Sequence, residues 1–313
     1  EIGVRLVGSE MCIRDSPKQY LSLKGKPVLY YALKAFEDSF IDEIVLVTGV
    51  GQEDYCQKEI VEHYGFQKVS HVIAGGKEIV DNGKCLVSYP KAEHAPCLLN
   101  TTKLKNPITP ESFRIEAPEG AKKVKVQVMD TLPWIPITQG REVELAVKDG
   151  VVQCDVEQDV LYIAQVERYG VNGNVGKAFM GGFHLKEGAI ASSVGHDNHN
   201  IIVMGTNFED MAIAVNHLIE IGGGQNIVKN GEILAEVSYP ICGLLSDMSG
   251  EELADEKRKL NGIIHELGSP ITIPFMFLSF ICLAAIPMYA VTDVGFIDVI
   301  KQEVISPIIE VIE

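Results

Sequence analysis

The sequence predicts an α/β protein, with an N-terminal Rossmann-like parallel half-sheet and a C-terminal layered α/β domain. Helical and strand-like apolar periods alternate over residues 17–78, which is the pattern of βα units in a parallel sheet. From about residue 111 onward, short apolar runs bounded by Gly and Asn surround two capped amphipathic helices. A chain of 313 residues is long for one domain, so two or three domains are expected.

Four segments divide the chain. Residues 1–16 show no clear period and resemble translated sequencing-adaptor DNA, so we assign them no role. Residues 17–78 form the half-sheet, residues 79–110 a hairpin remnant and a proline-rich linker, and residues 111–313 the layered domain.

Composition excludes several classes of partner. The chain has 27 basic and 43 acidic residues, and a net charge of −16 argues against nucleic acids and anionic membrane surfaces. Seven scattered cysteines without a Cys-x-x-Cys pair suit a reducing compartment better than a disulfide framework or a zinc site. No secretory signal is visible, so a cytoplasmic location is expected. The uncharged segment Ile271–Val291 is close to membrane-spanning length, but two prolines interrupt it and favour a buried piece of a soluble core.

The half-sheet is expected to contain two helices and two strands. Apolar residues recur at helical spacing over Pro27–Phe40 and Gln52–Tyr64, and Gly65 ends the second helix. Two β-rich runs, Ile44–Val47 and Val69–Ala74, follow the helices in alternation. This order predicts parallel pairing of the two strands.

Turn residues then predict the hairpins and strands that follow. Asn82-Gly83 predicts a hairpin over residues 77–87, Asp149-Gly150 one over residues 140–152, and Asn230-Gly231 one over residues 225–237. Further strands are expected at residues 113–128 and 160–166.

Capping patterns predict two helices in the layered domain. Thr206 and Glu209 predict a capping box for a helix over residues 208–221. Ser249 and Glu252 predict a second one, for a helix that ends near Leu267.

One stretch concentrates polar chemistry between apolar strands. Gly195–Asn200, the polar loop, separates two runs that are expected to be buried strands, Ala189–Val194 and Ile201–Met204. Asx turns explain Asp197, Asn198 and Asn200, but they leave His196 and His199 unaccounted for. Two interpretations remain open. The loop is either functional or a buried polar network that staples two strands.

Residues 17–78 resemble the N-terminal quarter of 2-C-methyl-D-erythritol 4-phosphate cytidylyltransferases. The segments that carry the resemblance are Pro17–Leu21, Gly25–Leu29, Ile41–Val47 and Gly75–Glu78. The resemblance implies that Lys18 stabilises charge on the CTP α-phosphate, and a solvated turn lysine is the alternative. The Gly-rich phosphate loop of that family is not supplied by residues 1–16.

A longer stretch, from about residue 77 to about residue 299, resembles the C-terminal part of bacterial adenine deaminases of the amidohydrolase superfamily. The matching segments are Glu167–Gly170, Gly188–Val194, His196–Asn200, Gly205–Asn207, Glu220–Gly224, Gly243–Asp247 and Pro274–Phe280. The resemblance implies hydrolysis of adenine to hypoxanthine and ammonia by metal-bound hydroxide in a (β/α)₈ barrel. Mn or Fe is the implied metal of the parent enzyme. No His-x-His pair occurs in the chain, so no metal ligand is carried over and no cofactor is expected on this chain.

The resemblance places the polar loop at the mouth of the purine site. His196, Asp197 and His199 are then catalytic candidates, and Asn198 and Asn200 candidates for substrate binding. Glu167 and Arg168 are further candidates for catalysis and substrate binding, although an ion pair at a strand end explains them equally well. A small purine is the implied partner, and a homo-oligomer is compatible with the resemblance.

Together these observations predict a fused reading frame, joined at Gly75–Glu78, whose parent activity is adenine deamination and whose product is inactive alone. Two alternatives stay open. One is cytidylyl transfer by residues 17–78, and the other is a non-catalytic purine-binding or interaction module built from residues 111–313.

Overall fold

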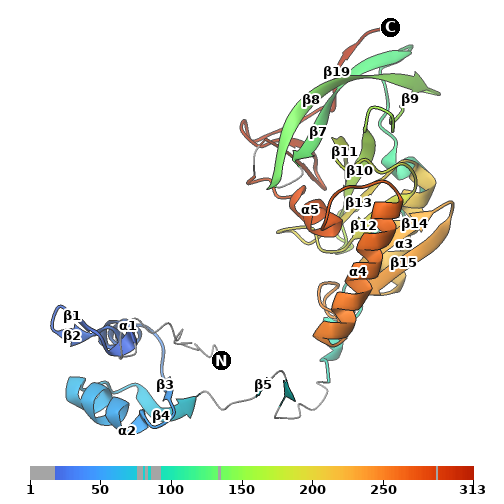
Figure 1. The fold of residues 1–313 in the computed structure, drawn as a ribbon. Coiled ribbons are helices and arrows are strands. Elements are labelled where there is room, and N and C mark those ends of the chain that lie inside the picture. Colours follow the sequence, from blue (N-terminus) through green and yellow to red (C-terminus); the bar gives the residue numbers. More distant parts are fainter. Residues whose placement is uncertain (1–17, 76–79, 82–83, 86–92, 133–134, 287) are drawn as a thin grey trace. The chain divides into compact units, whose positions relative to one another are not determined.

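The computed structural model of the chain describes residues 18–75, 80–81, 84–85, 93–132, 135–286 and 288–313 (Figure 1). The chain forms two compact units, residues 1–92 and residues 93–313. Each unit is described by itself.

The N-terminal unit is built around one parallel strand pair. Its elements are η1 (Lys18–Tyr20), β1 (Ser22–Leu23), β2 (Lys26–Pro27), α1 (Val28–Glu37), β3 (Ile44–Gly49), α2 (Glu53–Tyr55), the π-helical η2 (Cys56–Glu62), β4 (Val69–Gly75), β5 (Val80–Asp81) and β6 (Lys84–Cys85). Strands β3 and β4 are parallel, as the alternating pattern predicts. In the described part of this unit the remaining strands form only two-stranded antiparallel pairs, so the predicted half-sheet is reduced to β3 and β4.

A small core holds these helices and strands together. Its buried side chains are Leu33, Ile44, Leu46, Cys56, Ile60, Val61 and Phe66. The turn predicted at Asn82-Gly83 lies outside the described residues, although β5 and β6 on either side of it pair as a hairpin should.

The C-terminal unit is organised by a ten-stranded sheet. Short 3₁₀ turns, η3 (Pro96–Leu98) and η4 (Pro110–Phe113), precede it. Its strands are β7 (Lys123–Leu132), β8 (Ile135–Lys148), β9 (Val151–Val152), β10 (Leu161–Val166), β11 (Val175–Gly181), β12 (Ala189–Ser192), β13 (Ile201–Gly205), β14 (Gly224–Lys229), β15 (Glu232–Ser238) and β19 (Ile308–Val311). The order across the sheet is β15-β14-β12-β13-β10-β11-β7-β8-β9, and β19 also pairs with β7. Within this sheet β11 and β7 are parallel and the other paired neighbours are antiparallel.

Helices cover both faces of this sheet, which confirms a layered α/β arrangement. One face packs on α3 (Phe208–Glu220) through Ala164, Val203 and Val215. The opposite face packs on α4 (Gly250–Glu266) and α5 (Pro274–Phe280), together with the hairpin of β16 (Tyr289–Thr292) and β17 (Gly295–Asp298). A short strand, β18 (Glu303–Ile305), extends that hairpin. Because successive strand residues point to opposite faces, neighbours such as Ile163 and Ala164 enter different cores.

The predicted caps are right for one helix and wrong for the other. Ser249 and Glu252 form the expected capping box at the start of α4. At α3 the N-cap is Asn207, not Thr206, because the Asn207 side chain accepts the Asp210 N–H at 2.8 Å. The Thr206 hydroxyl instead donates to the Gly188 carbonyl at 3.3 Å.

The uncharged segment 271–291 is divided between elements of the core. Its described residues include α5 and the first part of β16. Within the described residues, no helix has the length and apolarity required to cross a membrane.

Candidate functional site

The polar loop connects two central strands of the large sheet. Strands β12 and β13 pair antiparallel, and Ser192 faces Ile202 just before the loop leaves the sheet. On its other side β13 pairs with β10, so Ile201 lies opposite Val166, next to Glu167 and Arg168. The sheet therefore brings the polar loop to the end of β10. The two buried strands and the turn between them were predicted from the sequence, and the structure confirms them.

The first half of the loop is open to solvent. The His196 side chain is 45% exposed and the Asp197 side chain 74% exposed, and the His196 Nδ1 contacts the Asp197 carboxylate. The His196 ring stacks on Phe280, with centroids 5.2 Å apart and planes 29° apart. The backbone N–H of His196 donates to the Ser279 carbonyl at 2.9 Å. The imidazole is thus held in place on one face and accessible elsewhere, so a staple that buries both rings is not what the structure shows.

The second half of the loop is tied to β10 by amides. Gln165, which is fully buried on β10, donates to the Asn198 side-chain oxygen at 3.0 Å, and the Asn198 amide donates back at 2.9 Å. The Tyr169 hydroxyl donates to the Asn198 carbonyl at 2.7 Å. Asn198 therefore has a positioning role in the structure, since its side-chain groups are used internally.

Asn200 closes the loop and is also buried. Its side-chain oxygen accepts the backbone N–H of Arg168 at 3.3 Å, and its side-chain amide donates to the Asp293 carboxylate at 3.2 Å. Asp293 lies between β16 and β17 and also accepts from the Asn174 amide at 3.3 Å. Asn200 thereby joins the loop to β10 and to the β16–β17 hairpin.

Arg168 is a buried cation surrounded by neutral oxygens. Only 2% of it is exposed, and its guanidinium donates to the carbonyl oxygens of His199 and Cys242 and to the Thr102 hydroxyl. Burial lowers the pKa of Arg168, because removal from water penalises the charged form. Its guanidinium is committed to protein oxygens, so the structure gives Arg168 a positioning role.

Glu167 does not pair with Arg168, so the ion pair at the strand end, which was the alternative explanation for these two residues, is not formed. The Glu167 carboxylate instead accepts backbone N–H groups of Tyr169 at 2.6 Å, Val171 at 3.2 Å and Gly173 at 3.1 Å. Burial alone would raise the pKa of Glu167, but these donors outweigh it and lower that pKa. Glu167 therefore remains ionised and orders the turn after β10.

His199 differs from His196 in its electrostatics. It is partly buried and has a φ of +54°, in the left-handed region. Burial lowers the pKa of His199, and the charges of Arg168 and His196 lower it further. Its imidazole therefore favours the neutral form near pH 7, in which one ring nitrogen donates and the other accepts.

The structure brings most of the predicted site residues together. His196, Asp197, Asn198, His199 and Asn200 share one cluster with Glu167 and Arg168. Lys18 belongs to the N-terminal unit, where it begins η1, and its side chain lies outside the described part. Sequence reasoning missed the partners Gln165, Tyr169, Phe280, Cys282 and Asp293. Tyr169 and Phe280 lie in segments that carry the resemblance, and Gln165 lies two residues before Glu167, but nothing in the sequence indicated their contacts with the polar loop.

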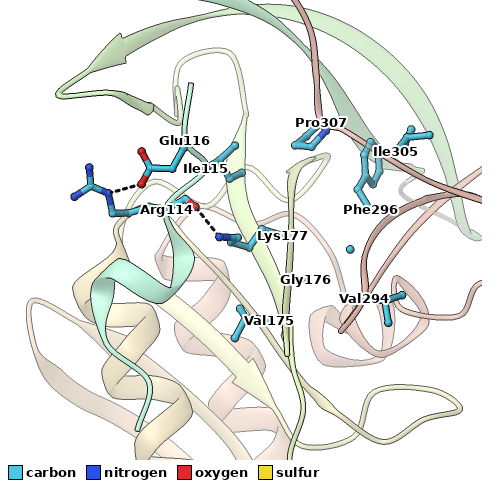
Figure 2. Close-up of a pocket in the computed structure, with 11 residues that line it drawn as sticks. Arg114, Ile115, Glu116, Val175, Gly176, Lys177, Val294, Phe296, Ile305 and Pro307 are labelled. Atoms are coloured by element: carbon cyan, nitrogen blue, oxygen red, sulfur yellow. Dashed lines mark hydrogen bonds and ion pairs between the residues drawn. The ribbon is translucent and has the colours of Figure 1, made fainter. Parts of the chain in front are cut away.

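A second candidate is a pocket of about 320 Å³ beside β11 (Figure 2). Lys177 and Arg114 line it, and the Lys177 amine donates to the Arg114 carbonyl at 2.8 Å. Glu116, which also lines it, pairs with the Arg114 guanidinium at 3.1 Å. Because its charged groups already contact one another or the backbone, this pocket has less free polar chemistry than the polar loop.

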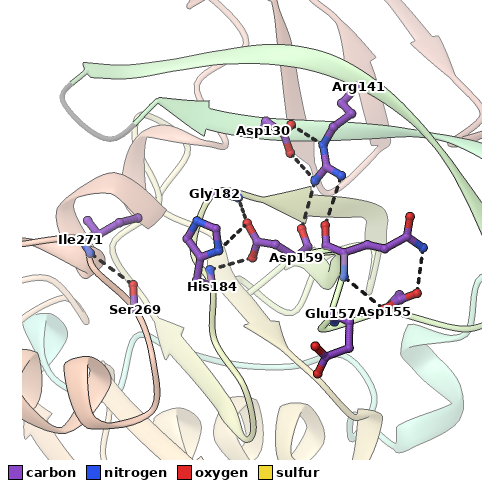
Figure 3. A network of polar contacts seen from close by, with 10 residues as sticks. Asp130, Arg141, Asp155, Glu157, Asp159, Gly182, His184, Ser269 and Ile271 are labelled. Carbon is purple, nitrogen blue, oxygen red and sulfur yellow. Dashed lines mark hydrogen bonds and ion pairs between the residues drawn. The ribbon is translucent and has the colours of Figure 1, made fainter.

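A third polar cluster has a structural role (Figure 3). Arg141 on β8 makes a bidentate pair with Asp130 on β7, at 2.6 and 2.9 Å, and donates to the Asp159 carbonyl at 3.1 Å. The Asp159 carboxylate accepts the backbone N–H groups of Gly182 at 2.6 Å and His184 at 2.7 Å. These bonds fix strands β7 and β8 to the turns around β10 and β11.

In the portion of the chain that the structure describes, no group of three or more His, Cys, Asp or Glu side chains could hold a metal ion. His196 and Asp197 form only a pair. The residues of the polar loop therefore do not fit a metal centre by themselves.

Comparison with known proteins identifies the larger unit. The model of the adenine deaminase C-terminal domain matches residues 136–303. Adenine deaminase 1 of Carboxydothermus hydrogenoformans is 44% identical over 243 residues, which are 77% of this chain and 40% of that protein. The adenine deaminase of Clostridium botulinum is 41% identical over 78% of this chain and 40% of its own length, and that of Moorella thermoacetica is 36% identical over 76% and 40%.

The chain spans about 40% of the length of the curated relatives it matches. These comparisons give no support to the cytidylyltransferase resemblance of residues 17–78. The residues that match the family include β10 to β17, and therefore the polar loop and the strands on either side of it. The chain belongs to the adenine deaminase C-terminal domain family.

Proposed function

We propose that the chain is the C-terminal part of an adenine deaminase, in which the parent enzyme converts adenine and water to hypoxanthine and ammonia. The polar loop is proposed to line the purine site of that parent. The observation that carries this proposal is the exposed His196–Asp197 pair, which is held over Phe280 by an otherwise buried network. A purine is the small-molecule partner that this exposed His–Asp pair suits.

The geometry suits hydrogen bonding to a heteroaromatic ring. The His196 imidazole can donate to or accept from a ring nitrogen, and the Asp197 carboxylate accepts from an exocyclic amino group. His199, whose neutral form is favoured, adds a second imidazole that can donate a hydrogen bond through one ring nitrogen and accept one through the other. Gln165, Asn198 and Arg168 hold the loop, while the His196 and Asp197 side chains contact each other and stay exposed.

Mn or Fe belongs to the proposal for the parent enzyme only. The described residues of this chain do not assemble a site for either metal, so no step is derived through one. The role left to this chain is to position a purine and to hold or move a proton at the polar loop. Cytidylyl transfer by residues 17–78 is not proposed, because no comparison supports it.

Non-catalytic purine binding is the second candidate function, and the same exposed pair supports it. A chain that keeps the polar loop but covers only part of its relatives can retain affinity for adenine without turnover. Equilibrium dialysis with radiolabelled adenine measures this directly, and loss of binding in His196→Ala would assign it to the loop.

The parent function is tested in a full-length relative that carries the counterpart of the polar loop. Replacing the counterpart of His196 by Ala is expected to lower kcat for ammonia release from adenine by on the order of 10²-fold. The matched control replaces the counterpart of His217, an α3 histidine that contacts Glu236 at the surface, by Gln. Equal kcat values for the His196 variant and the parent would contradict the proposal.

A further inference from the structure

A pocket of about 340 Å³ lies between α4, α5 and the ends of β14 and β15. Its walls are mainly apolar and include Leu253, Phe275 and Met276. Two of its lining side chains, Leu245 and Ile273, are also exposed. A concave apolar site of this volume with a few polar groups is typical of small-molecule binding sites.

One cation, Lys257 on α4, lines this pocket. Its side-chain amine contacts the Gln225 side-chain oxygen and lies 4.9 Å from the centroid of the Phe275 ring. Among the described residues, none of the ion pairs involves Lys257, and its polar partner Gln225 is neutral. By contrast, Lys259 on the same helix pairs with Glu256 at 2.6 Å. Lys257 is therefore a partly buried positive charge without a carboxylate to balance it.

The Gln225 side chain next to Lys257 is already used. The Gln225 oxygen also accepts from the Tyr239 hydroxyl at 3.3 Å, and the Gln225 amide donates to the Ser192 hydroxyl at 3.3 Å. An ammonium group has three N–H donors, and the contact with Gln225 uses one of them. A ligand oxygen in the pocket could accept a donor that protein atoms leave free.

We infer that this pocket is a binding site for a small aromatic carboxylate, whose carboxylate contacts Lys257 and whose ring packs against Phe275 and Leu253. The charge of Lys257 selects an anion, and the apolar walls, which include the Phe275 ring, select a hydrophobic body that can pack on an aromatic face. Val194 and Ser279 also line this pocket, so it borders the polar loop, whose His196 backbone N–H donates to the Ser279 carbonyl. The inference is carried by Lys257 and the apolar walls and does not depend on the proposed deaminase function.

The protonation of Lys257 fits this occupant. Burial lowers the pKa of Lys257 to about 8, so most molecules still carry the charge near pH 7. A bound carboxylate next to the amine favours the protonated form and raises that pKa again. Binding should therefore weaken as pH rises above about 8.

The test is isothermal titration of the full chain with 2-naphthoate and with its neutral analogue 2-naphthamide. We expect 2-naphthoate to bind at least about tenfold more tightly than the amide, which corresponds to one charge-assisted contact. Lys257→Met should remove that preference, whereas Lys257→Arg should retain at least part of it. Lys259→Met is the matched control and should leave both affinities unchanged.

Two results would overturn the inference. One is equal affinity of the unmodified chain for 2-naphthoate and 2-naphthamide, with absence of binding by both included. The other is an unchanged preference for 2-naphthoate in Lys257→Met, with a circular dichroism spectrum that matches that of the parent chain. If Lys257→Met fails to fold, the preference for 2-naphthoate over 2-naphthamide is measured for Lys257→Arg and the parent chain at pH values below and above about 8. The parent chain should lose preference above that pH and Lys257→Arg should keep it, because arginine stays charged at both. A parent preference that does not change with pH would overturn the inference.

Discussion

The side chains of Gln165 and Asn198 hydrogen-bond to each other in both directions, at 3.0 and 2.9 Å. Gln165 is fully buried on a central strand, and Asn198 lies in the polar loop 33 residues later. Two reciprocal amide bonds in a buried setting specify one loop conformation, because any other leaves buried donors and acceptors unpaired. The exposed His196 and Asp197 are presented by this internal arrangement.

A double-mutant cycle tests that relationship. Gln165→Ala and Asn198→Ala should each lower the free energy of unfolding by on the order of 1–3 kcal/mol, because each leaves the other amide unpaired. The double variant should cost less than the sum, with a coupling energy of about 1 kcal/mol. Urea denaturation followed by circular dichroism gives all four values. Simple additivity would show that the two amides act independently.

Arg168 should be far more important for stability than an exposed arginine. Arg168→Met removes a buried guanidinium and leaves the His199 and Cys242 carbonyl oxygens without their donor. We expect a loss on the order of 1–3 kcal/mol in the free energy of unfolding for each buried carbonyl oxygen left without a donor. Arg258→Met is the control, because that side chain is 74% exposed and its loss should stay within about 0.5 kcal/mol. Similar losses for both variants would contradict this role of Arg168.

Local patterns predicted the elements that carry the site. Two short apolar runs bounded by Gly and Asn gave β12 and β13 with the polar loop between them. The capping box of α4 was readable because Ser249 and Glu252 have the required spacing. At α3 two adjacent residues, Thr206 and Asn207, both suit an N-cap, and only the fold decides between them.

The partners of the site were not predictable in the same way. Asn200 contacts Asp293 across 93 residues of sequence, through a hairpin that packs on the sheet only in the folded state. Glu167 and Arg168 are adjacent and of opposite charge, which suggested an ion pair. The turn from Tyr169 to Gly173 instead presents its N–H groups to Glu167, while the Arg168 side chain points to Thr102 and Cys242. A pattern of charged residues does not show where backbone N–H groups will lie, so these hydrogen bonds could not be predicted from it.

The two units should separate on limited proteolysis. Each hydrophobic core draws its buried residues from one unit, Leu33 to Phe66 in one case and Ile108 onward in the others. Cleavage is therefore expected between about Gly75 and Pro110, with a stable fragment that retains residues up to Glu313. Mass spectrometry of the products gives the cleavage sites. One cooperative calorimetric transition together with resistance in that segment would show that the units fold as one.

The chain by itself should not release ammonia from adenine. It spans about 40% of the length of the relatives named adenine deaminase, and the polar loop offers a His–Asp pair where a metal-dependent hydrolase needs more ligands. A coupled ammonia assay with added Mn²⁺ or Fe²⁺ should match the buffer blank. Release above the blank that disappears in His196→Ala would assign catalysis to this chain. The same release in that variant would indicate a contaminating enzyme.

Substitution of His199 tests whether the polar loop has a functional or a structural role. The test is clear only if the substituted residue fits the backbone conformation at this position. Its φ of +54° would strain alanine, whereas asparagine tolerates that conformation, so His199→Asn is the better substitution. The backbone carbonyl that Arg168 uses is retained in this variant. If the imidazole is functional, the free energy of unfolding near pH 7 should change by less than about 1 kcal/mol. In a full-length relative, the counterpart substitution should lower kcat by on the order of 10²-fold.

The pH dependence of stability provides the second measurement for His199. Its folded-state pKa lies below the ordinary value of 6.5, so the unfolded chain binds more protons between those two values. The contribution of neutral His199 to stability is therefore fully present above pH 6.5 and is lost as pH falls through the folded-state pKa. His199→Asn should remove this dependence, so the variant gains stability relative to the parent chain as pH falls below about 6.5. Parallel stability curves for the two proteins would mean that the ring titrates alike in both states. A loss of about 1–3 kcal/mol in the free energy of unfolding of His199→Asn, with unchanged kcat in the full-length relative, would show that His199 has a structural role.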